Sequence, residues 1–113
     1  MNRFFDPTEP ILSPATLVQT ITRKSPGDLA LPGRAVITFS PGDLTHLVRL
    51  SESSPVRSWL PFRHLFLTPT EKTVLMRCEF GGPNIAAAVE ELSAFGVSEF
   101  IVCGYCGSLG PAL

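Results

Sequence analysis

Residues 73–103 read TVLMRCEFGGPNIAAAVEELSAFGVSEFIVC and give the clearest secondary-structure pattern in the chain. The β-branched and apolar residues from Thr73 to Phe80 predict a strand. The run Gly81-Gly82-Pro83-Asn84 then predicts the start of a helix, because proline is favoured at the first helical positions, and Gly96 marks its end. Apolar residues recur in this helix at helical spacing, which predicts a buried face made of Ile85, Ala88, Val89, Leu92 and Phe95.

The other face of this helix and the segment after it complete the pattern. Glu90 and Glu91 are expected on a solvated face. Phe100 to Cys103 is a continuous apolar run, which is typical of a strand covered on both faces. Strand, helix and strand over residues 73–104 form a βαβ unit, and such units pair their strands in parallel with a right-handed crossover. The sequence therefore predicts an α/β fold.

The segments that precede this unit fit the same fold class. Ala35 to Phe39 predicts a buried strand, which enters a tight loop at Ser40 to Asp43. Leu44 to Leu50 has the apolar spacing of a short helix that leaves this loop. Leu65 to Leu67 predicts another strand, which forms a hairpin with the next strand through a turn at Thr68 to Lys72.

The domain organisation follows from length and proline content. Residues 1–34 are rich in proline and are expected to hold one short helix at Ala15 to Arg23. Residues 35–113 then contain the strands and helices of the α/β domain. A chain of 113 residues that is 44% hydrophobic and 17% charged has material for one small core.

Charge and cysteine content exclude several classes of function. The formal net charge is -1 and no run of Lys or Arg is present, so nucleic acid is not an expected partner. We found neither an apolar stretch of membrane-spanning length nor the features of a signal peptide at the N-terminus. The three cysteines lack the spacing of a secreted disulfide scaffold, which favours reduced thiols. The chain is thus expected to be soluble and cytoplasmic, with no membrane partner.

Three glycine-bearing segments begin where predicted strands end. They are Pro41-Gly42-Asp43, Gly81-Gly82-Pro83 and Gly104-Tyr105-Cys106-Gly107. Ligands of open α/β sheets gather beyond the carboxyl ends of the strands, where glycine allows close approach and a helix start attracts an anion. These segments are either the floor of one binding pocket, suited to a phosphate or a sugar hydroxyl, or ordinary turns at strand ends.

The order of these motifs resembles that of the purine and uridine nucleoside phosphorylase superfamily. The resemblance is specific in Phe80-Gly81-Gly82-Pro83-Asn84, in the Val89-Glu90-Glu91-Leu92 helix and in Gly104-Tyr105-Cys106-Gly107-Ser108-Leu109. The strand and loop at residues 36–43 are similar to the first strand and Pro-Gly-Asp loop of that family. The resemblance implies a three-layer fold with a central mixed sheet, of which residues 35–113 are the N-terminal part.

The resemblance also implies a reaction and a set of site residues. Members of the family cleave the N-glycosidic bond of a purine or pyrimidine nucleoside, with inorganic phosphate as co-substrate and without another cofactor or a metal. By position, the phosphate-binding residues are Gly42, His46, Arg57 and Tyr105, and Arg57 matches an arginine that reaches into a neighbouring subunit. The substrate-binding residues by position are Phe80, Gly81, Tyr105, Cys106 and Gly107. A homo-oligomer is the expected assembly, with a nucleoside and phosphate as small-molecule partners.

The chain departs from the family pattern at three positions. His46 and Val102 stand where the phosphorylases carry arginine, and Tyr105 stands where they favour Ser or Thr. Arginine is a strong bidentate phosphate donor, so its absence leaves a hydrolytic nucleosidase as an alternative. In the family the ribose-binding glutamate and the group that holds the leaving base lie downstream of the Gly104 segment. We therefore also keep a non-catalytic nucleoside-binding or assembly fragment as an alternative.

Single residues outside the resemblance have simpler expectations. Cys103 and Cys106 form a C-x-x-C, but no helix start follows and no further ligands are suitably spaced, so a redox or metal role is less favoured. Cys103 is instead expected to be buried in a strand. Asp43 is expected to accept hydrogen bonds from nearby backbone N–H groups. His46 is expected on a helix surface, and Trp59 in a core or a subunit interface.

Overall fold

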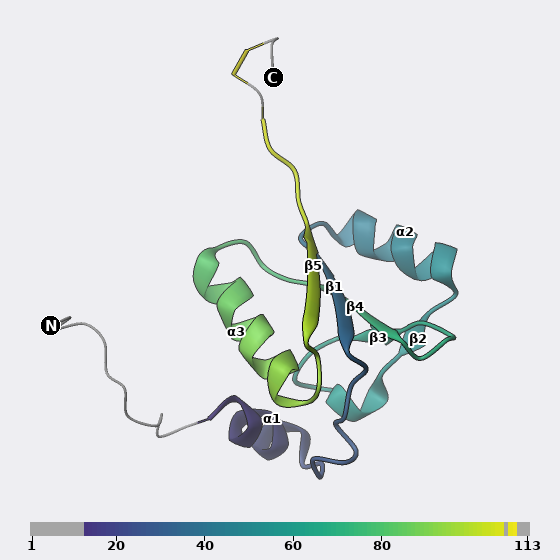
Figure 1. Ribbon diagram of the computed structural model, residues 1–113, viewed down its shortest axis with the longest axis vertical. Coiled ribbons are helices and arrows are strands. Elements are labelled where there is room, and N and C mark those ends of the chain that lie inside the picture. Colours follow the sequence, from purple (N-terminus) through teal and green to yellow (C-terminus); the bar gives the residue numbers. More distant parts are fainter. Residues whose placement is uncertain (1–12, 108, 111–113) are drawn as a thin grey trace, which may run out of the picture.

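The computed structural model describes residues 13–107 and 109–110, in which a mixed sheet has helices on both sides (Figure 1). The elements are α1 (Pro14–Thr22), β1 (Arg34–Thr38), α2 (Pro41–Ser51), β2 (Ser54–Pro55), the 3-10 helix η1 (Arg57–Trp59), β3 (Phe66–Leu67), β4 (Thr73–Arg77), α3 (Gly82–Ala94) and β5 (Glu99–Cys103). The predicted α/β class, the mixed sheet and the hairpin of β3 and β4 are confirmed. Within these described residues, no helix is long and apolar enough to cross a membrane.

The five strands lie in the order β2-β3-β4-β1-β5. β1 pairs in parallel with both β4 and β5, whereas β3 is antiparallel to β4 and to β2. The predicted βαβ unit is therefore present with a difference: β4 and β5 run parallel but do not pair, because β1 lies between them. A crossover through a helix about 10 Å wide can span two strand spacings of about 4.8 Å each.

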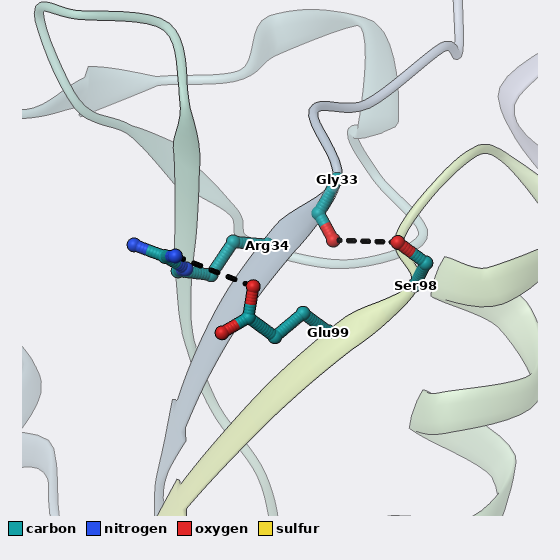
Figure 2. A network of polar contacts seen from close by, with 4 residues as sticks. All are labelled: Gly33, Arg34, Ser98 and Glu99. Atoms are coloured by element: carbon teal, nitrogen blue, oxygen red, sulfur yellow. Dashed lines mark hydrogen bonds and ion pairs between the residues drawn. The ribbon is translucent and has the colours of Figure 1, made fainter.

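A small polar network joins the first residues of β1 to the first residues of β5 (Figure 2). Ser98 Oγ donates to the Gly33 carbonyl at 3.5 Å, and the Arg34 guanidinium lies 3.3 Å from the Glu99 carboxylate. Both charged side chains are about half exposed, so this ion pair adds little to stability. It aligns the first residues of the two strands.

The hydrophobic core lies between the sheet and the helices α1 and α3. Ala35 and Ile37 of β1 are fully buried there, together with Leu92 of α3. Trp59 of η1 lies in the same core, where its ring meets that of Phe95 edge-on at 5.4 Å and its Nε1 donates to the Leu29 carbonyl at 2.9 Å. This hydrogen bond satisfies the indole N–H, so the ring can be buried without an unpaired donor.

Helix α2 lies on the opposite side of the sheet from α3 (Figure 1). It begins at Pro41, so the tight loop predicted at Ser40 to Asp43 is wrong. Ser40 is instead the N-cap residue, with its hydroxyl accepting from the Asp43 N–H, and Pro41 occupies a first-turn position where no N–H is needed. Gly42 therefore belongs to the first helical turn.

Two further expectations about burial are wrong. Glu91 is only 6% exposed and pairs with Arg63, because it falls in the same stripe of α3 as Ala88, Leu92 and Phe95. β5 is not covered on both faces. It is an edge strand, so Ile101 and Val102 are 44% and 48% exposed and Cys103 is exposed as well.

Gly96 provides a test of the connection between α3 and β5. Its φ is +118°, and a Cβ placed on it would lie 2.8 Å from the Leu31 carbonyl oxygen. We expect Gly96→Ala to lower the free energy of unfolding by about 2 kcal/mol or more, measured by urea denaturation. Gly82→Ala is the matched control, because no atom lies within 4 Å of a Cβ there. Equal effects of the two substitutions would contradict this account.

Candidate functional site

The carboxyl ends of β1, β4 and β5 meet around Phe39, which directly follows β1. The Phe39 ring stacks on that of Phe80, with 5.5 Å between the centroids and 10° between the planes. Gly104 follows β5 and packs against the same ring, since a Cβ at this position would lie 3.5 Å from Phe39 Cδ2. The aromatic side chain that follows β1 therefore contacts residues that follow β4 and β5.

A cavity of about 230 Å³ lies beside these strand ends. We call it the strand-end cavity. It is lined by Thr38, Asp43, His46, Leu47, Cys103 and Tyr105. Across it, the Tyr105 hydroxyl donates to Asp43 Oδ1 at 2.9 Å, which joins residues from α2 and from the segment after β5.

The Asp43–Tyr105 hydrogen bond sets the electrostatics of the strand-end cavity. It raises the pKa of Tyr105, first because the hydrogen bond favours the neutral phenol and second because the Asp43 carboxylate repels a phenolate. Asp43 also lies in the first turn of α2, where a carboxylate complements the positive end of the helix dipole. None of the lining residues is Arg or Lys, so the cavity is acidic.

The predicted phosphate-binding residues are only partly assembled. His46 and Tyr105 line the strand-end cavity, and Gly42 precedes His46 by one turn of α2. His46 is exposed, as expected for a helix surface. Arg57 is exposed on η1, which packs against α1, and it does not line this cavity.

The predicted substrate-binding residues lie around the start of α3 and the end of β5. Phe80 is 77% exposed, and one face of its ring stacks on Phe39. Gly81 has a φ of +112° and is the N-cap residue of α3, and the Asn84 amide donates to the Phe80 carbonyl at 2.7 Å. Cys106 and Gly107 are exposed in the segment that follows β5.

Four of the six lining residues are not among the predicted site residues, namely Thr38, Asp43, Leu47 and Cys103. Thr38 is buried at the last position of β1, and its hydroxyl donates to the Met76 carbonyl at 3.5 Å. The Asp43 carboxylate was expected to bond nearby backbone N–H groups, but it accepts from Tyr105 instead. These residues are 62 positions apart, so no local pattern could have paired them.

The cysteines differ in exposure. Cys78 is buried, and burial raises the pKa of its thiol. Cys103 and Cys106 are exposed free thiols, so the predicted burial of Cys103 is wrong, because β5 has no neighbour on its outer side. Across residues 13–107 and 109–110, no group of three or more His, Cys, Asp or Glu side chains is placed to hold a metal ion.

Comparisons with known proteins found no family model, no curated protein and no solved structure that matches the chain. The resemblance to nucleoside phosphorylases therefore depends on the quoted motifs alone and stays a prediction.

The titration of Tyr105 tests the geometry of the strand-end cavity. Tyr105 is the single tyrosine in the chain, so ultraviolet absorbance near the phenolate band reports its ionisation alone. We expect its pKa to lie above the ordinary value of about 10, and Asp43→Asn to lower it toward that value. Glu90→Gln, an exposed carboxylate on α3, is the control and should leave the titration unchanged. An unshifted wild-type pKa would rule out the hydrogen bond.

Proposed function

We propose that this chain forms the nucleoside-binding part of a nucleoside phosphorylase-like protein, which cleaves the N-glycosidic bond of a purine or pyrimidine nucleoside. The observation that carries the proposal is the strand-end cavity, which is lined by the last residues of β1 and β5, by Tyr105 and by α2. Binding beyond the carboxyl ends of strands is the general rule for open α/β sheets. The proposed family, three-layer fold and reaction come from the sequence motifs that resemble those of the nucleoside phosphorylases.

The side chains around the strand ends suit a sugar that develops positive charge. Glycosidic-bond cleavage passes through a transition state with positive charge on the ribose, which a nearby carboxylate such as that of Asp43 stabilises. The exposed ring of Phe80 offers an apolar surface for the sugar. In phosphorolysis the phosphate would lie at the start of α2. Pro41 has no N–H there and Ser40 caps the Asp43 N–H, so the Gly42 N–H is the backbone donor left for the phosphate.

One observation favours the hydrolytic alternative. The strand-end cavity contains the Asp43 carboxylate and is lined by no Arg or Lys, so a phosphate dianion entering it would meet a like charge and no bidentate donor. Water carries no charge and meets no such barrier. The Asp43 carboxylate can accept a proton from an attacking water, and the Tyr105 hydroxyl lies 2.9 Å from it to hold its orientation.

Nucleoside binding by the chain is the first test. We expect inosine, uridine or methylthioadenosine to raise the melting temperature of the 113-residue chain, and Tyr105→Ala to abolish the increase because it removes one wall of the cavity. Glu90→Ala is the matched control, since Glu90 is an exposed residue of α3 outside the cavity, and it should bind like the wild type. If no nucleoside stabilises the wild type, the proposal is wrong.

Release of the free base from the same nucleosides then separates the reactions. Base release that depends strictly on inorganic phosphate indicates phosphorolysis, and equal release without phosphate indicates hydrolysis. Asp43→Asn should lower either rate at least about tenfold, the loss expected when a group that acts in proton transfer or charge stabilisation is removed. Binding without any base release would overturn the catalytic part of the proposal and leave a nucleoside-binding module.

A further inference from the structure

The two edges of the sheet are built differently. β2 forms one edge with only two residues, and the second of them is Pro55, which lacks a backbone donor. β5 forms the other edge with five residues, Glu99–Cys103, and contains no Pro or Lys. Short strands, proline and lysine are the usual means of preventing strand addition at an edge. β2 has two of them and β5 has none.

The hydrogen bonds between β5 and β1 show which peptide groups of β5 face the outer edge of the sheet. The Glu99 N–H donates to the Gly33 carbonyl at 2.9 Å, so the peptide groups of Glu99 face β1. Because these groups alternate along a strand, the N–H and C=O groups of Phe100 and Val102 face the outer edge. In Figure 1 β5 is the near strand of the sheet, and neither α2 nor α3 crosses it.

These outward groups define a symmetric register for antiparallel pairing. A two-fold axis at Ile101 places Phe100 opposite Val102 of a second copy, and each of these pairs exchanges two backbone hydrogen bonds. Ile101 then lies opposite Ile101 of the second copy, and the two residues form a non-hydrogen-bonded pair. The side chains of Ile101 and Val102, which are 44% and 48% exposed, become covered.

The outward peptide groups of β5 select this orientation. In a parallel ladder, a residue that faces the partner strand is aligned with a residue that faces away from it, so two copies that both present Phe100 and Val102 cannot pair in register. Glu99 is the only charged residue of the strand and is compatible with antiparallel pairing. The two Glu99 residues then lie about 13 Å apart along the strands, opposite Cys103 of the other copy.

We propose that β5 is a self-association edge, which pairs antiparallel with β5 of a second copy of this chain and joins the two five-stranded sheets into one. This pairing uses the backbone groups of β5 and is independent of the proposed function. Because the paired strand is short, association is expected to be reversible and concentration-dependent.

Replacing Ile101 by lysine tests the proposal. Sedimentation equilibrium of the wild type should show the mass rising with concentration from 12.2 kDa toward twice that value. Ile101→Lys places two ammonium groups opposite each other at the two-fold axis and should weaken association at least about tenfold. Ile21→Lys is the matched control, since Ile21 on α1 is 42% exposed, and it should associate like the wild type. A wild type that stays monomeric at every concentration overturns the proposal, as does an equal effect of the two variants.

A cross-link tests the register and does not depend on the lysine variants. Opposite residues of a non-hydrogen-bonded pair have Cα atoms about 4.5 Å apart, within the range that a disulfide bridges. In a Cys103→Ser, Cys106→Ser background, Ile101→Cys should form a covalent dimer when oxidised glutathione accepts the two protons and two electrons of the thiol pair. Ile21→Cys in the same background should stay monomeric on a non-reducing gel. Failure of Ile101→Cys to cross-link overturns the proposed register.

Discussion

The hydrogen bonding of β1 on both sides is the constraint on which the rest of the structure depends. Thr38 directs its carbonyl toward β4, where it accepts from the Cys78 N–H at 2.8 Å, while the start of β5 bonds to Gly33 on the other side. Since β1 runs parallel to both neighbours, all three strands end at the same edge of the sheet. The aromatic contact of Phe39 and the strand-end cavity exist because of this shared edge.

The secondary structure was predictable to the extent that it is encoded locally. The apolar stripe of α3, the strand at Ala35 and the hairpin turn at Thr68 follow from spacing and turn chemistry, which neighbouring residues determine. Two burial predictions failed because burial depends on partners. The apolar run of β5 looks like a central strand, yet its place at the edge is set by the order of the strands. Glu91 looks solvated, yet Arg63 allows it to lie within the buried face of α3.

The candidate site was predictable at its backbone and less so at its side chains. Among the glycines after strands, Gly104 lies close to Phe39, whereas no atom lies within 4 Å of a Cβ placed on Gly82 or Gly107. The Asp43–Tyr105 hydrogen bond could not be inferred, because it joins distant segments that only the parallel arrangement of β1 and β5 brings together. The sequence position of Arg57 says nothing about its location, and η1 holds it next to α1.

β5 lies next to both surfaces to which we assign a role. Its last residue, Cys103, and the nearby Tyr105 line the strand-end cavity, while the peptide groups of Phe100 and Val102 face its outer edge. Tyr105 is 84% exposed, and the hydrogen bond to Asp43 is the polar contact that connects it to α2. Cys103 therefore belongs both to the strand that carries the proposed self-association edge and to the lining of the cavity.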